Sequence, residues 1–287
     1  MKLRDIFSKA EKPLLSVEFF PPKTDKGEEN LWTCIQELKP MHPAYVSVTY
    51  GAGGTTQDRT RNIVLRIKEQ TGLEPVAHLT CVGATQAQLN ALLEDYRTHG
   101  LDNILALRGD PPEGMDKFEA TSGGLSHATD LIEFIHQRNH FSIACATYPE
   151  GHPESTHGVA DDIQYLKLKQ DNGADMAVTQ YFFDNDTFFR FRDAAHAAGV
   201  TLPIVPGIMP ITNFEQIVRF SGMCGASIPE KIHQQMSPIQ QNLDDVKKLG
   251  IDIAISQCQA LLSNGVPGLH FYTLNKSEAT LAINREL

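Results

Sequence analysis

The sequence predicts a single-domain α/β protein, a (β/α)8 TIM barrel in which eight parallel strands alternate with helices. Three observations support this prediction. Short β-branched and aromatic runs recur along the chain, helical patterns lie between them, and no low-complexity linker or internal repeat divides the 287 residues. This length is large for one ordinary core but normal for a barrel, so we expect one domain over residues 1–287.

Eight strands are expected along the chain. Most are apolar on both faces, as parallel strands are when helices cover both sides of the sheet. In chain order they are residues 14–20, 44–50, 74–80, 103–107, 141–147, 175–181, 202–206 and 268–272.

Helices are expected between these strands. In residues 85–100 the apolar positions recur with helical spacing, Thr85 is placed to cap the start and Gly100 to end the helix. Similar patterns cover residues 58–72, 161–173, 186–199 and 244–265, and the last of these has an irregular, proline-containing approach around 225–240.

The main alternative is an open, doubly wound sheet. That fold normally carries a G-x-G-x-x-G fingerprint after its first strand. Here the first strand ends in Phe-Pro-Pro and the fingerprint is absent, which favours the barrel.

Composition excludes some classes of partner. The formal net charge of -10 argues against general affinity for nucleic acid or an anionic membrane. No apolar run is long enough for a signal-peptide core or a membrane helix. The five cysteines are scattered and lack CxxC spacing, so we expect reduced thiols and a cytoplasmic protein.

Polar residues stand at the ends of the predicted strands, where barrels carry their chemistry. Each alone is weak evidence, but together they predict a ring of hydrogen-bonding and titratable groups around one mouth. They are Glu18, Thr49, His78, Arg108 with Asp110, Tyr148 and Gln180.

Glu18 is the most unusual of them, because it lies in an apolar strand between Val17 and Phe19. A buried carboxylate is costly to ionise unless it has a partner. Two interpretations stay open on the residues alone: a structural carboxylate paired with an arginine inside the barrel, or a functional acid.

Other motifs have ordinary alternatives. His78 alone is more often a core histidine than a ligand, and Arg108-Gly109-Asp110 could be a simple turn with a local ion pair. The loop at residues 51–56 could cradle a phosphate, but it lacks a Gly-Lys-Ser/Thr ending, so a turn is favoured. No metal-ligand spacing or G-x-S-x-G motif is found.

Eight motifs resemble, in order and over nearly the whole chain, the methylenetetrahydrofolate reductases in their bacterial, single-domain form. They are "SVEFFPPK", "YVSVTYGAGG", "AHLTC", "ILALRGDPP", "YPEGHPES", "VTQYFFD", "VPGIMPITNF" and "HFYTLN". The resemblance implies an FAD-containing barrel that passes a hydride from NADH or NADPH to 5,10-methylenetetrahydrofolate, giving the methyl group used in methionine synthesis. It also implies a homo-oligomer.

The resemblance carries over to individual residues. It implies that FAD is held by Thr49, His78, Arg108, Gly109, Asp110, Ala128, Tyr148, His152, Asp162 and Lys169. It implies that folate is bound by Glu18, Asp110, Gln180, Phe220, Tyr272 and Lys276.

The chain departs from the family pattern at two places. The loop before Ala128 is longer than expected and has His127 where an aromatic is common, which bears on one flavin contact. Lys276 replaces the usual arginine, and lysine keeps the charge but loses the two-pronged grip on a carboxylate.

The implied reaction gives Glu18 a role. Protonating N10 of methylenetetrahydrofolate opens its ring to an iminium cation, which accepts hydride readily. An ordinary glutamate is less than about 1% protonated at neutral pH, so we expect burial to raise the pKa of Glu18 and make it the general acid. Asp110 is expected to stay ionised and favour the cation.

Two competing functions remain open. One is a flavin barrel that oxidises an amine or imino acid, similar to the proline-oxidising enzymes, which only turnover with each substrate distinguishes. The other is a flavin- or folate-binding protein without catalysis, against which the intact Glu18, Asp110 and Gln180 argue.

Overall fold

The structure is a computed structural model that describes residues 1–50, 57–111 and 118–287. The loop at residues 51–56, interpreted above as a turn, lies outside the described residues. So do Pro112 and the residues after it up to 117, which follow the Arg-Gly-Asp motif.

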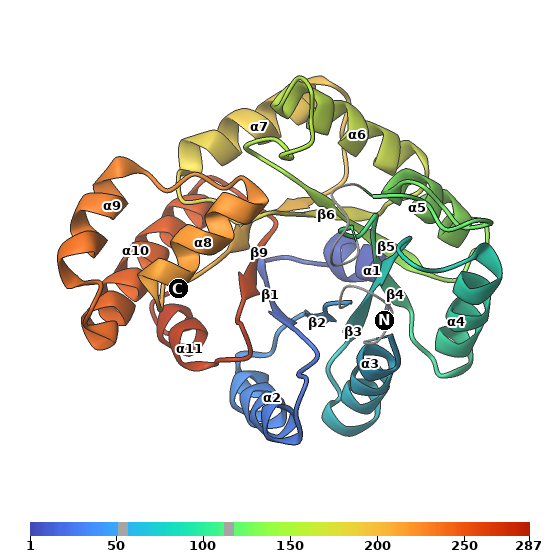
Figure 1. Ribbon diagram of the computed structural model, residues 1–287, viewed down its shortest axis with the longest axis horizontal. Helices are drawn as coiled ribbons and strands as arrows, with labels where there is room; N and C mark the ends of the chain where they lie inside the picture. Colours follow the sequence, from blue (N-terminus) through green and yellow to red (C-terminus); the bar gives the residue numbers. More distant parts are fainter. Residues whose placement is uncertain (51–56, 112–117) are drawn as a thin grey trace.

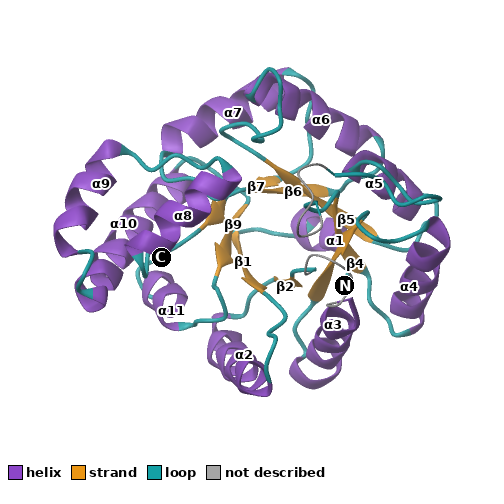
Figure 2. Cartoon of the chain, viewed as in Figure 1, coloured by secondary structure: helices purple, strands orange, loops and turns teal. Residues whose placement is uncertain are grey.

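A parallel sheet forms a barrel at the centre of the molecule, as predicted (Figure 2). Within the described residues it has 9 strands in the order β7-β6-β5-β4-β3-β2-β1-β9-β8. The strands are β1 (Leu14–Phe19), β2 (Tyr45–Val48), β3 (Pro75–Thr80), β4 (Asn103–Leu107), β5 (Ser142–Thr147), β6 (Met176–Thr179), β7 (Ile204–Val205), β8 (Gly207–Ile208) and β9 (Gly268–Tyr272).

The seventh strand, predicted at residues 202–206, extends past its predicted end and is interrupted at Pro206, which explains the additional strand. β7 and β8 flank Pro206, whose missing N–H interrupts the hydrogen-bond ladder. β7 pairs with β6 and β8 pairs with β9, while the Pro206 carbonyl accepts a 3.0 Å bond from the His270 N–H. The two short pieces therefore join both ends of the sheet.

The described part of the chain contains a series of helices, and all but α1 lie around the outside of the strands (Figure 1). They are α1 (Leu3–Ser8), α2 (Asp25–Leu38), α3 (Gln57–Thr71), α4 (Gln86–Thr98), α5 (Ala128–His136), α6 (Val159–Asp171), α7 (Asn185–Ala197), α8 (Phe214–Cys224), α9 (Glu230–Met236), α10 (Leu243–Ser263) and α11 (Glu278–Asn284), with 3-10 turns at Lys39–Met41 and Ser237–Ile239.

The helix signals in the sequence are confirmed where capping chemistry is strong. Thr85 caps α4 in a reciprocal capping box with Gln88. The expectation of an irregular segment at 225–240 is wrong in part, because α9 forms there. Pro229 precedes its first turn, and Ile232 and Met236, one turn apart, bury the same face.

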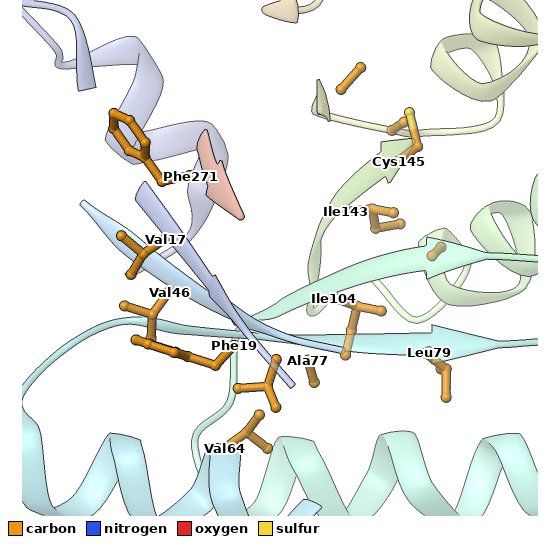
Figure 3. Packing of buried hydrophobic residues seen from close by; sticks show 14 of the residues in the cluster. Val17, Phe19, Val46, Val64, Ala77, Leu79, Ile104, Ile143, Cys145 and Phe271 are labelled. Carbon is orange, nitrogen blue, oxygen red and sulfur yellow. The ribbon is translucent and has the colours of Figure 1, made fainter. Parts of the chain in front are cut away.

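The apolar core lies mainly between the barrel and its helices. Alternate strand residues point outward, among them Val17 and Phe19 of β1, and meet side chains such as Val64 of α3 (Figure 3). No helix in the described part of the chain has both the length and the apolar character needed to cross a bilayer.

The amino end of the barrel is closed by α1, which is seen within the ring of strands in Figure 1. Leu3 is fully buried against inward-facing residues of the strands, and its N–H donates a 2.8 Å bond to Asn103 at the start of β4. The open end is therefore the carboxyl end, where the polar residues were predicted.

Two helical glycines give a test of the packing. A Cβ on Gly250 of α10 would lie 1.9 Å from the Ile211 carbonyl oxygen, whereas none of the described residues comes within 4 Å of a Cβ on Gly222 of α8. Gly250→Ala should lower the free energy of unfolding by about 2–3 kcal/mol despite the helix preference of alanine. Gly222→Ala should raise it by roughly 0.5–1 kcal/mol.

Urea unfolding of both variants checks this prediction. Equal effects of the two substitutions would contradict the close packing of α10 against the segment after β8.

Candidate active site

One side of the barrel interior is polar. Ser16 and Glu18 of β1, Ser47 of β2, His78 of β3 and His270 of β9 alternate with outward-facing apolar residues, so all five point inward. Most inward residues of β4 to β7 are apolar and cluster with Leu3 of α1, while Asn103 and Ser142, at the amino ends of β4 and β5, accept bonds from backbone N–H groups of α1. The barrel interior therefore has a polar side, formed by β1, β2, β3 and β9, and a mainly apolar side. Glu18 lies on the polar side.

The Glu18 carboxylate has three polar neighbours. Two come from the strands paired with β1, which are β2 and β9, and the third comes from β3, which pairs with β2. Its Oε2 lies 3.2 Å from Ser47 Oγ, 3.3 Å from His78 Nε2 and 3.5 Å from His270 Nε2. The side chain is 16% exposed, so it is reached from the mouth of the barrel only. The partners are imidazoles, which corrects the alternative of an arginine partner.

The expected raised pKa of Glu18 is wrong for this arrangement. Burial does raise the pKa, but the contacts with His270 and His78 lower it by more, and the result is a pKa of about 2. Glu18 is therefore an ionised carboxylate held by two imidazoles at neutral pH.

A cavity of about 470 Å³ opens between the carboxyl ends of β4 and β5 and the helices α5 and α6. We call it the α5–α6 cavity. Six of the ten residues expected at the cofactor line it: Arg108, Ala128, Tyr148, His152, Asp162 and Lys169.

Local structure positions these residues. Gly109 has φ +89°, and a Cβ there would lie 2.6 Å from Val82 Cγ2, so the turn that presents Arg108 requires glycine. Ala128 is the first residue of α5, and the exposed His127 before it is the helix N-cap and also lines the cavity. Lys169 of α6 donates a 2.8 Å bond to the Ala146 carbonyl at the end of β5.

Arg108 is paired across the cavity and not with Asp110. Its Nη2 lies 3.0 Å from Oε1 of Glu154, in the loop after β5, and a second bond joins Nη1 to Oε2. Hydrogen bonding to Arg108 lowers the pKa of Glu154. The alternative of a local ion pair within Arg108-Gly109-Asp110 is therefore wrong.

The buried Asp162 shapes the loop after β5. Its Oδ2 accepts bonds from the His152 N–H at 2.8 Å and from Ser155 Oγ at 2.9 Å. His152 Nδ1 in turn accepts a 3.1 Å bond from the Glu154 N–H, and burial lowers the pKa of His152. His152 is therefore a neutral imidazole that orients the loop carrying Glu154.

A second cavity, of about 440 Å³, lies on the other side of Tyr148 and His152 and is bordered by α8. We call it the α8 cavity. Asp110, Gln180 and Phe220, three of the residues that the resemblance gives to the substrate, line it. The rings of Tyr148 and His152 meet edge to face at 4.6 Å and line both cavities, so the two spaces are neighbours. Burial and then Asp110 raise the pKa of Tyr148 to about 12.

The remaining predicted residues lie elsewhere at the same end. Tyr272 and Lys276 line a third cavity, of about 370 Å³, near the starts of α10 and α11. Thr49 directly follows β2 and donates its N–H to the Phe19 carbonyl. The structure brings Asp110, Gln180 and Phe220 together but leaves Glu18 and Lys276 outside the described lining of the α8 cavity.

Several residues of this barrel interior and its open end were not predicted from the sequence. Ser16, Ser47 and His270 contact Glu18 or each other, and Glu154 pairs with Arg108. Strand parity is a signal for the first three, because alternate residues of a strand face the same side. Ser16, Ser47 and His270 each lie two residues before a predicted site residue, namely Glu18, Thr49 and Tyr272. Among the described residues, no cluster of three or more His, Cys, Asp or Glu side chains could hold a metal ion.

A (β/α)8 barrel with a buried carboxylate and neighbouring cavities at the carboxyl ends of its strands has the design of a barrel enzyme. The chain belongs to the methylenetetrahydrofolate reductase family, whose pattern it matches over residues 2–287. The resemblance found in the motifs is thus confirmed.

Relatives from bacteria and plants support this assignment. The chain is 41% identical over 269 residues to the Escherichia coli 5,10-methylenetetrahydrofolate reductase, covering 94% of this chain and 88% of the relative. It is 39% identical over 278 residues to the maize (Zea mays) methylenetetrahydrofolate reductase (NADH) 1, covering 93% of this chain. The match covers 47% of the maize protein, so the chain spans about half the length of the plant relatives.

Solved structures show the same fold at low identity. An uncharacterized protein from Clostridium thermocellum that binds two copies of 5-methyl-5,6,7,8-tetrahydrofolic acid superposes with a TM-score of 0.70 and 15% identity, covering 99% of this chain and 96% of that one. An oxaloacetate acetylhydrolase superposes with a TM-score of 0.53 and 14% identity, covering 98% and 80%.

Proposed function

We propose that this protein reduces 5,10-methylenetetrahydrofolate to 5-methyltetrahydrofolate with NADH or NADPH and a bound FAD. The observation that carries the proposal is the family match over residues 2–287. The names of its bacterial and plant relatives support the reaction, and the plant names include NADH.

The α5–α6 cavity fits FAD. Two cations, Arg108 and Lys169, border it and suit the pyrophosphate. On β3, Thr80 Oγ1 is buried without a hydrogen-bond partner among the described residues, and a polar atom of a ligand would satisfy it. When bound, FAD supplies the two-electron centre between nicotinamide and folate.

The α8 cavity fits the folate. Phe220 offers an apolar ring to a flat heterocycle, and Gln180 offers an amide. Asp110 is exposed at the border of this cavity, where its carboxylate favours the cationic, ring-opened form of the substrate.

Glu18 is the group we propose to protonate N10 of the substrate. Its side chain points into the barrel and is 16% exposed. Because its contacts hold it ionised, the proton must come to it from a neighbour before it acts as an acid.

We also propose that the protein works in the cytoplasm. All five cysteines are free thiols, which suits a reducing compartment. A homo-oligomer remains a prediction from the family resemblance.

The proposed reaction is tested by anaerobic visible spectroscopy of the purified protein. We expect flavin absorption that bleaches with NADH or NADPH and returns when 5,10-methylenetetrahydrofolate is added. In Glu18→Gln the bleaching should persist, while the return slows by about 100-fold or more. Glu94→Gln, on the outer helix α4, is the matched control.

A colourless protein that takes up no FAD would contradict the cofactor. Return of the flavin absorption in Glu18→Gln at nearly the wild-type rate would contradict the role of Glu18 alone.

The pair of Arg108 and Glu154 gives a prediction for cofactor affinity. Glu154 is half-exposed and occupies the guanidinium that a phosphate would bind. Glu154→Gln should therefore tighten FAD binding by about two- to fivefold at low salt, measured by flavin fluorescence. Glu94→Gln, which breaks the surface pair with Arg97, should leave FAD affinity unchanged. Weaker binding in Glu154→Gln would mean that Glu154 itself holds the cofactor.

A further inference from the structure

His270 is a buried imidazole to which the proposed function assigns no role. Its side chain is 0% exposed. Its Nδ1 lies 2.8 Å from Ser16 Oγ, and the same hydroxyl lies 3.2 Å from the Leu269 carbonyl oxygen. The carbonyl can only accept, so the Ser16 hydroxyl donates to it and accepts from the N–H at Nδ1. This fixes a hydrogen on Nδ1.

The other ring nitrogen faces Glu18. Nε2 of His270 is 3.5 Å from Glu18 Oε2 and 3.4 Å from Ser47 Oγ, which is itself 3.2 Å from Oε2. Because Nδ1 keeps its hydrogen, Nε2 is the atom that gains and loses a proton, and it does so toward the carboxylate.

We propose that His270 is a positioning residue that holds the proton which Glu18 delivers to the substrate. The proton moves from Nε2 to Oε2, the N–H electron pair stays on the ring, and an O–H bond forms on Glu18. The bond from Nδ1 to Ser16 is kept in both states. This inference rests on the proposed function, in which Glu18 is the acid.

The charges favour such a transfer inside the barrel. Imidazolium with carboxylate, and imidazole with carboxylic acid, both have zero net charge, so the transfer neither creates nor removes net charge in the buried space. After Glu18 protonates N10, the pair has lost one proton and recovers one from solvent. The proton taken from solvent is the one proton that the overall reduction of the folate by NADH or NADPH consumes.

The other groups around Glu18 are less suited to this role. Tyr45 stacks on the His270 ring at 5.8 Å, and Tyr272 meets it edge-on at 5.4 Å. Burial raises the pKa of both tyrosines well above the usual value, so they stay neutral. His78 Nε2 also lies 3.3 Å from Oε2 but outside hydrogen-bond geometry, and the family resemblance gives His78 to the cofactor.

Nitrogen-15 NMR of histidine-labelled protein without added folate tests where the proton lies. The His270 signals are assigned by their loss in His270→Asn. At neutral pH we expect both ring nitrogens of His270 to carry protons in the wild type. In Glu18→Gln we expect a neutral ring with its hydrogen on Nδ1. A neutral His270 in both proteins, or a doubly protonated one in both, would overturn the proposal. This measurement needs neither flavin reduction nor turnover.

Transient kinetics tests the consequence in the holoenzyme. His270→Gln keeps an amide donor in place of the imidazole but cannot release a proton to Glu18. We expect the folate step at saturating folate to slow by at least about tenfold. Folate affinity and the rate of flavin reduction by NADH should stay within about twofold. His140→Gln, a histidine near the start of β5, is the control.

A folate step in His270→Gln within about threefold of the wild type would overturn the proposal. A wild-type protein that never reoxidises with folate would instead contradict the proposed function. The NMR result would then still decide whether His270 and Glu18 share a proton.

Discussion

The contact of one carboxylate with two imidazoles is the interaction on which the arrangement of this barrel depends. Glu18 points into a space that barrels usually fill with branched apolar side chains. It is tolerated there because His78 and His270 lie 3.3 and 3.5 Å from one of its oxygens. Removing either partner would leave a buried charge less compensated, which is the costly case. The strand register places both histidines, because β1 pairs with β9 on one side and with β2, beside β3, on the other.

The rest of the fold keeps this polar side accessible from one end only. α1 seals the amino end with Leu3, and the short strands β7 and β8 close the circle of strands around Pro206. At the carboxyl end, the loop after β5 carries Tyr148, His152 and Glu154 and separates two neighbouring cavities. One has cations along its border and the other an aromatic ring and an amide, and these features suit the anionic cofactor and the flat substrate that we propose.

Much of this structure could be predicted from the sequence. The barrel followed from alternating strand and helix patterns, and residues at strand ends such as Arg108 and Tyr148 lie at one mouth because parallel strands all end on the same side. The break at Pro206 and helix α9 were not predicted, since both depend on tertiary pairing and packing. The ionisation of Glu18 was predicted wrongly. Burial is visible in a sequence, but the partners from β3 and β9 are 60 or more residues away and appear only when the barrel closes.

The state of the Glu18 carboxylate is the most direct test of this account. Isotope-edited infrared spectra of wild type minus Glu18→Gln show whether the group absorbs as carboxylate or as carboxylic acid. A pKa lowered from the usual 4.5 to about 2 means that the ionised form, and the stability it contributes, persists above pH 4.5 and is lost only as the pH falls toward 2. We therefore expect the carboxylate band of Glu18 at neutral pH and still at pH 4.5. A carboxylic acid band from Glu18 at neutral pH would contradict it.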